Sequence, residues 1–146
     1  MKDEFIKYLN TIGITTQVLH NRIEEIYEVC SEMCPDEIVD IFVDEYIKED
    51  GSRDYEDLNF FSDTYQCGAK QFLTKDDYGI ARLKKKVLLS KIQMQNYDFK
   101  KATEKSRLYL EVKFEGELLA SFKASKENCD FLRDIILKYY KPNFKD

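Results

Sequence analysis

The stretch "LYLEVKFEGELLASFKASKENCDFLRDII", residues Leu108–Ile136, shows two sequence periods in direct succession. Apolar and polar residues alternate on both sides of Glu115-Gly116, so each side predicts a strand with one core face and one solvent face. Ser125 then stands where an N-cap is expected, and the apolar spacing changes to that of a helix. The stretch therefore predicts a tight hairpin that leads into an amphipathic C-terminal helix. The apolar stripe of this helix comprises Phe131, Leu132, Ile135, Ile136 and Tyr139, and Pro142 is expected to end it.

The first 34 residues have helical periodicity with an unbroken four-three spacing, which is typical of a seam that faces another helix. Gly13 and the threonines Thr15 and Thr16 lie inside this pattern. They allow either one long helix or two, in which case one threonine caps the second helix. Pro35 is expected to end the helical segment. The seam residues are Phe5, Leu9, Ile12, Thr16, Leu19, Ile23, Ile26, Cys30 and Met33.

From Ile38 onward the period changes to near alternation. Asp50-Gly51 is a strong hairpin signal, because both residues tolerate positive φ. "YQCGAKQFL" (residues 65–73) predicts a third strand after a turn at "SDT". "KVLLSKIQMQNYDF" (residues 86–99) predicts another strand, with a helix over its first half as the alternative. One more strand can be hidden near "ARLKKKVLL" (residues 81–89). We expect an α+β fold: a bent antiparallel sheet or partly open barrel of about six to seven strands, capped by a C-terminal helix.

The predicted order of elements resembles the pleckstrin-homology-like superfold, in the manner of its bacterial members. The "LYLEVKFEGELLASFKAS" hairpin and the "SKENCDFLRDIILKYY" helix carry the resemblance, which covers residues 36–143. It implies a bent sheet plugged by the final helix, and a domain division into a helical segment (residues 1–35) and a β domain (residues 36–146). Lipid-binding members place basic residues along the first hairpin. Here acidic residues surround Lys48 and Arg53, so the lipid site is not carried over. The superfold then leaves peptide or protein binding.

The net charge of −5 conceals a gradient along the chain. Residues 1–80 carry a net charge of −12, and residues 81–146 carry +7. The two halves can attract one another within one folded body, which we favour, or a basic face can seek an acidic partner. The second possibility gives an alternative function, the binding of nucleic acid or an anionic lipid headgroup through a basic patch. The patch residues are Arg82, Lys84, Lys85, Lys86, Lys100, Lys101 and Lys105.

No catalytic or metal-binding signature is evident in the sequence. Cys30 and Cys34 lie one helical turn apart, but His20 is the only histidine and no second cysteine pair has ligand spacing. We therefore expect no metal, no cofactor and no catalytic residues. A hydrolase that uses paired carboxylates or a cysteine nucleophile ranks last, because no nucleophile has a visible base.

The chain has no apolar run long enough to span a membrane and no signal peptide, so we expect a cytoplasmic protein without membrane insertion. The leading hypothesis is a non-enzymatic protein-interaction or scaffolding module. Its helical stripe either packs on the β domain or binds a protein partner or a second copy of the chain. The candidate contact residues are Leu9, Leu19, Ile23 and Ile26.

Overall fold

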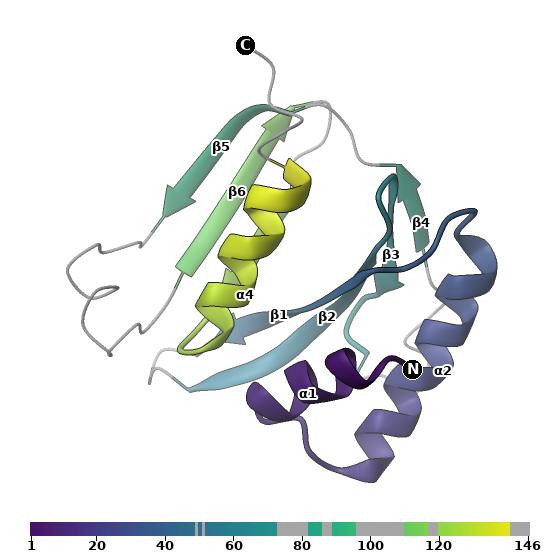
Figure 1. Ribbon diagram of the computed structural model, residues 1–146. Coiled ribbons are helices and arrows are strands. Elements are labelled where there is room, and N and C mark those ends of the chain that lie inside the picture. The colour runs from purple at the N-terminus through teal and green to yellow at the C-terminus, as the bar shows by residue number, and fades with distance from the viewer. Residues whose placement is uncertain are drawn as a thin grey trace. The chain divides into compact units, whose positions relative to one another are not determined.

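The computed structural model describes residues 1–48, 50, 52–72, 82–85, 89–95, 110–116 and 120–140 (Figure 1). The chain divides into two compact units, residues 1–43 with 55–86 and residues 44–54 with 87–146. Strands β1 (Asp40–Ile47) and β2 (Arg53–Phe61) contribute residues to both units. The predicted division into residues 1–35 and 36–146 does not follow from these units and stays a prediction.

The N-terminal segment forms two helices, α1 (Asp3–Thr11) and α2 (Gln17–Met33). Gly13 ends α1 because its φ of 98° reverses the chain direction. The N–H of Gly13 donates to the carbonyl of Asn10 at 3.1 Å, and the N–H of Ile14 donates to the carbonyl of Leu9 at 2.8 Å. This pair of hydrogen bonds is a Schellman motif, and it satisfies carbonyls that the end of the helix leaves open.

Helix α2 begins at a threonine cap. The Thr16 side chain accepts a hydrogen bond from the backbone N–H of Leu19 at 3.4 Å. The helix ends at Met33, two residues before Pro35. Of the two arrangements that the sequence allowed, the structure contains the helix pair.

The first sheet has the strand order β1-β2-β3-β4, with β3 at Tyr65–Ala69 and β4 at Arg82–Lys85. The N–H of Lys48 donates to the Ser52 carbonyl and the N–H of Val39 to the Phe61 carbonyl, so β1 and β2 run antiparallel. The β2–β3 and β3–β4 pairs are also antiparallel. The hairpin lies at the predicted position, where the Asp50 side chain accepts hydrogen bonds from the backbone N–H and the hydroxyl of Ser52.

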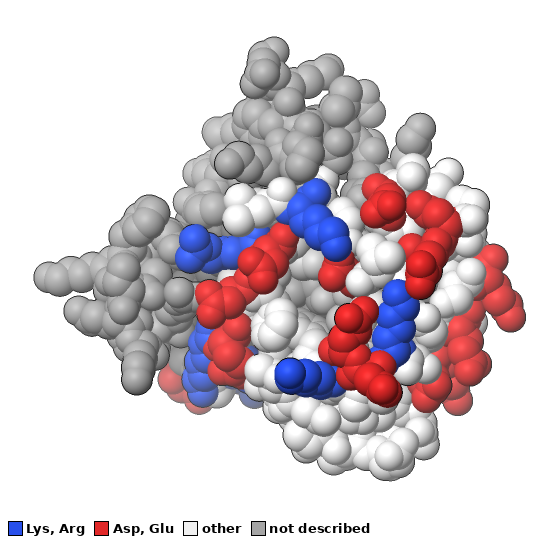
Figure 2. All heavy atoms as spheres, viewed as in Figure 1, with Lys and Arg blue, Asp and Glu red and all other residues white. Residues whose placement is uncertain are grey.

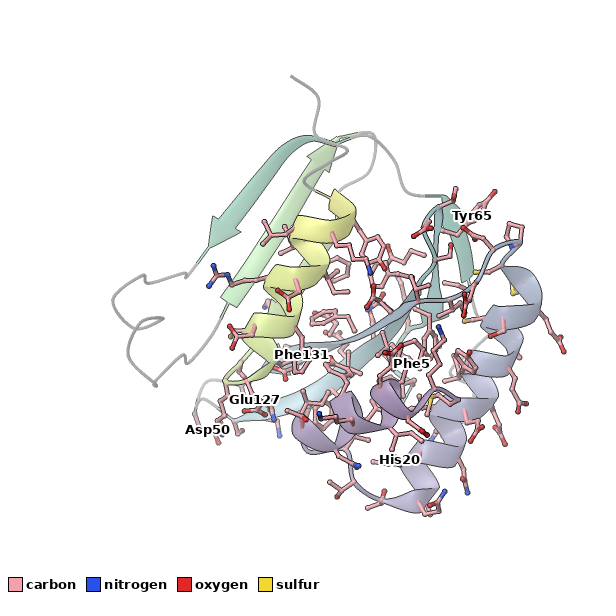
Figure 3. The ribbon with its side chains drawn as sticks, in the orientation of Figure 1. Phe5, His20, Asp50, Tyr65, Glu127 and Phe131 are labelled. Atoms are coloured by element: carbon pink, nitrogen blue, oxygen red, sulfur yellow. The ribbon has the colours of Figure 1, made fainter. Side chains whose placement is uncertain are left out.

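An aromatic cluster in the first unit joins α1, α2 and β2. The ring of Phe5 lies 5.9 Å from that of Tyr27 and 6.1 Å from that of Phe60, and the last two rings lie 5.4 Å apart, each distance between centroids. Figure 3 labels Phe5 on α1. The buried Tyr8 adds a polar tie, because its hydroxyl accepts a hydrogen bond from the N–H of Val43 at 2.8 Å.

The second sheet has the order β5-β6-β7 (Leu89–Gln95, Leu110–Gly116 and Ala120–Ala124), and both of its pairs are antiparallel. Helix α4 (Asn128–Ile135) follows β7, contacts it, and continues as a π-helical turn, η1 (Ile136–Tyr140). The predicted stripe of this helix is buried at Leu132, Ile135, Ile136 and Tyr139. Phe131 is half-buried, and Pro142 lies outside the described residues.

The fold is therefore α+β, with antiparallel sheets and helices. The described residues form two sheets, and they do not show the single sheet of about six to seven strands that the sequence predicted. Among them, no helix is both long and apolar enough to cross a membrane.

Gly68 is a position where the fold tolerates no side chain. An ideal β-carbon on Gly68 would lie 1.8 Å from the carbonyl oxygen of Leu58 in β2. Because the neighbour is backbone, the strand itself would have to move. We expect Gly68→Ala to lower the free energy of unfolding by about 3 kcal/mol or more, measured by urea denaturation. The exposed Lys70→Ala is the control and should stay within about 0.5 kcal/mol of the wild type.

Candidate functional site

The four predicted contact residues do not form an exposed seam in the structure. Leu9, Ile23 and Ile26 are buried, and Leu19 is half-buried. They contribute to the face with which the helix pair packs within the first unit. Their role in binding a partner stays a prediction, and the exposed surface of α2 comprises other residues.

Four of the seven residues of the predicted basic patch lie outside the described part of the chain. The backbone of Arg82, Lys84 and Lys85 forms most of β4, but their side chains are not described. Lys86, Lys100, Lys101 and Lys105 lie outside the described residues. The anionic-ligand alternative is therefore untested.

The β1–β2 hairpin contains a buried polar cluster that sequence reasoning missed. Arg53 extends toward Glu45 on β1 and Glu127 at the beginning of α4, and its nitrogens lie 2.7 Å and 2.8 Å from their carboxylate oxygens. The Arg53 side chain is only 15% exposed and that of Glu45 is fully buried. Figure 3 labels Glu127 where α4 begins. Because Arg53 is engaged by two carboxylates, it is not available to a phosphate group, which agrees with the omission of the lipid site.

Three further donors complete this cluster, which we call the Arg53 cluster (Asp44, Glu45, Arg53, Lys123, Ser125, Glu127 and Asn128). The Ser125 hydroxyl donates to Glu45 at 2.8 Å, and the Asn128 amide donates to it at 3.2 Å. The backbone N–H of Lys123 donates to the Asp44 carboxylate at 2.6 Å. These bonds fasten the hairpin to β7 and to the first residue of α4 within the second unit.

The expected N-cap role of Ser125 is wrong. Helix α4 begins at Asn128, and its cap position is Glu127, whose side chain makes no capping hydrogen bond. The Ser125 hydroxyl donates to Glu45 instead. A buried carboxylate costs more free energy without hydrogen-bond donors than a helix N-terminus whose N–H groups can bond to water. The Ser125 hydroxyl therefore bonds to Glu45 and not to the helix.

The two carboxylates that share Arg53 have pKa values displaced in opposite directions. Burial raises the pKa of Glu45, although Arg53, Ser125 and Asn128 favour its ionised form. For the less buried Glu127, burial also acts upward. However, hydrogen bonds from its own backbone and from Arg53 outweigh burial and lower its pKa.

Three of the five large apolar side chains that are exposed among the described residues belong to α2. Val18, Val29 and Met33 are 76%, 42% and 38% exposed. At 3.6 residues per turn, these three side chains lie on one side of the helix, and Glu25, Glu28 and Glu32 lie next to them. The three glutamates are also exposed. Figure 2 shows red acidic side chains along the flank occupied by α2.

His20 and the four cysteines, which the sequence analysis considered for metal binding, take part in the packing of the fold. The Nε2 of His20 lies 2.7 Å from the carbonyl oxygen of Ile14, so the ring bridges the connection between α1 and α2. All four cysteines are buried free thiols. Within the described ranges, no group of three or more His, Cys, Asp or Glu side chains is arranged to hold a metal ion.

Comparison with known proteins gives no relative for this chain: no family model, curated protein or solved structure matches it.

Two ion pairs on the same hairpin provide a matched test of burial. We expect Arg53→Ala to destabilise the protein by about 3 kcal/mol, because it leaves the buried Glu45 without its cation. Lys48→Ala breaks the ion pair between the Lys48 Nζ and a carboxylate oxygen of Asp54, which lie 3.2 Å apart. The side chains of Lys48 and Asp54 are 48% and 58% exposed. The cost of Lys48→Ala should stay below about 1 kcal/mol. Equal losses in a urea titration would contradict the buried cluster.

The opposite pKa displacements predict opposite pH dependences of stability. The carboxyl of Glu45 has an ordinary pKa of 4.5 in the unfolded chain and a higher pKa in the folded protein. As pH rises above 4.5, the unfolded chain releases the Glu45 proton first, so the contribution of Glu45 to the free energy of unfolding falls. The destabilisation by Glu45→Gln should therefore shrink as pH rises above 4.5. Glu127 stabilises above 4.5, and its contribution disappears as pH falls through its lowered pKa.

The Glu127→Gln variant is therefore the internal reference, and its cost should grow over the same rise in pH. Thermal unfolding at several pH values would measure both slopes. A cost of Glu45→Gln that grows toward pH 7 would show that the ion pair with Arg53 outweighs burial.

Proposed function

We propose that this chain is a non-enzymatic protein-interaction module that docks through the outer face of α2. The observation that supports it is the set of exposed apolar side chains, Val18, Val29 and Met33, on a helix whose adjoining face is buried. Exposed apolar residues aligned on one helix face are the anchors with which a helix enters an apolar groove.

The charge of α2 specifies the chemistry of the partner. The helix carries four glutamates and one arginine, and the exposed Glu25, Glu28 and Glu32 border the exposed apolar side chains. A second copy of α2 would bring carboxylates against carboxylates, which costs free energy. The proposed partner is therefore a different protein that presents an apolar groove with lysines or arginines along its rim.

We also propose a cytoplasmic location and a pleckstrin-homology-like architecture for residues 36–143. The four free thiols support the location, because thiols persist in reducing compartments. The successive antiparallel pairings and the contact of α4 with β7 support the architecture. In an NMR or crystal structure, backbone contacts between β4 and β5 would join the two sheets, and their absence would contradict one continuous sheet.

The docking proposal is testable by site-specific photo-crosslinking. A photoreactive residue at position 29 should capture one protein in cells, and the same residue at the exposed position 4 of α1 should not. With the purified partner, Val29→Asp should weaken binding at least about tenfold, because a carboxylate would enter the apolar contact. Calorimetric titration of the full-length chains would measure the dissociation constant.

A pair of charge reversals separates the local contact from the overall charge. Glu32→Lys on α2 and Glu4→Lys on α1 change the net charge equally, and both residues are exposed. We expect Glu32→Lys to weaken binding much more, and added salt to weaken the wild-type complex. Equal effects of the two reversals, capture of a second copy of this chain, or unchanged binding by Val29→Asp would overturn the proposal.

A further inference from the structure

Side chains of the β1–β2 hairpin lie along the outer edge of β7 in the second unit. Among the described strands, β7 pairs with β6 alone, so it forms one edge of its sheet. In an antiparallel pair, every second residue directs its backbone N–H and C=O away from the neighbouring strand. Lys123 is such a residue, because its N–H donates to the Asp44 carboxylate at 2.6 Å.

The next backbone group along this edge also bonds to a side chain. Ser125 directly follows β7, and the Arg53 guanidinium lies 3.4 Å from its carbonyl oxygen and 3.3 Å from its hydroxyl. Figure 3 labels Asp50 at the tip of the hairpin that supplies both side chains. A neighbouring strand would offer an acceptor to the N–H of Lys123 and a donor to the carbonyl of Ser125. Asp44 supplies the acceptor and Arg53 the donor, so they take the places of backbone groups.

These edge contacts are buried and held in position. The exposed fractions of Asp44 and Glu45 are 8% and 0%. The Arg53 guanidinium is fixed by Glu45 at 2.7 Å and by Glu127 at 2.8 Å. A strand that approached this edge would take the N–H of Lys123 from Asp44. The buried carboxylate would then lack its donor, which costs free energy and opposes the approach.

We infer that Asp44 and Arg53 seal the edge of β7 and keep a second copy of this chain from pairing with it. Unprotected strand edges pair readily with other strands, and charged side chains at an edge prevent this. The seal is an inhibitory contact within the chain. Because it consists of side chains, it can open while β7 stays paired with β6.

A second copy is the occupant that matches this edge. Two β7 strands related by a twofold axis at Phe122 would place Lys123 of each copy opposite Ser121 of the other. Both residues are of the outward-directed set, so each N–H would face a carbonyl across the axis. Lys123 is the only charged residue of β7, so no like charges would meet within the strand pair.

Sedimentation velocity of the full-length protein over a series of concentrations tests the inference. We expect the wild type to stay a monomer of 17.4 kDa. Asp44→Ala should associate reversibly toward twice this mass, because it releases the edge N–H of Lys123. Asp44→Asn is the matched control and should stay monomeric, since its amide oxygen still accepts from Lys123. A wild type that dimerises, or a folded Asp44→Ala that stays monomeric, would overturn the inference.

Amide hydrogen exchange followed by NMR tests the seal in the wild type, so it does not depend on the folding of a variant. The Lys123 amide should exchange at least about tenfold more slowly than an unprotected amide. In Asp44→Ala the Lys123 amide should lose this protection where the chain is monomeric, at low concentration. The amide of Phe122, which faces β6, should keep its protection. An unprotected Lys123 amide in the wild type would contradict the seal.

A double variant identifies the surface through which Asp44→Ala associates. Proline has no N–H to give to an incoming strand, and edge strands accept it where the N–H points outward. Asp44→Ala/Lys123→Pro should therefore return to a monomer. Asp44→Ala/Val29→Asp should still associate, because α2 is not part of the strand pair. The opposite pattern would assign the contact to the outer face of α2 and overturn the inference.

Discussion

The burial of the helix pair against the first sheet is the constraint on which the docking proposal depends. The contacts of Phe5, Tyr27 and Phe60 hold α1, α2 and β2 together. Because Leu9, Ile23 and Ile26 are buried in the same unit, the rotation of α2 about its axis is fixed. This rotation directs Val18 and Val29 outward. It also brings α2 into contact with β3.

The polar interactions of the second unit follow a different principle. A buried carboxylate such as Glu45 is costly unless several donors surround it, and here the donors come from three separate segments. Arg53 forms ion pairs with both Glu45 and Glu127. One of the acidic residues of the hairpin, Glu45, is therefore neutralised inside the protein. The hairpin whose acidic residues surround Arg53 in the sequence thus forms part of an internal ion-pair network.

The face of α2 that is left outside by this packing is different from the one that the heptad-like spacing suggested. Apolar spacing predicted a seam correctly, but it did not say whether the seam would contact another chain or the chain's own sheet. The buried positions of Ile23 and Ile26 use the seam internally. The proposed interaction surface combines Met33, the last residue of the seam, with Val18 and Val29, which lie outside the four-three spacing. Single apolar residues outside a periodic pattern do not reveal such a surface in the sequence.

Local period and turn chemistry determined much of this protein from its sequence: the antiparallel strands β6 and β7, the buried stripe at Leu132 and Ile135, the hairpin near Asp50 and the end of α2 before Pro35. These features depend on neighbouring residues only. The predicted turn at Glu115-Gly116 was misplaced, because both residues pair with β5 as the last residues of β6. The tertiary structure alone decided the hydrogen bond of Ser125 to Glu45 and the contact of α2 with β3. Each of these depends on free energies of burial and on partners that are distant along the chain, and no short stretch of sequence contains that information.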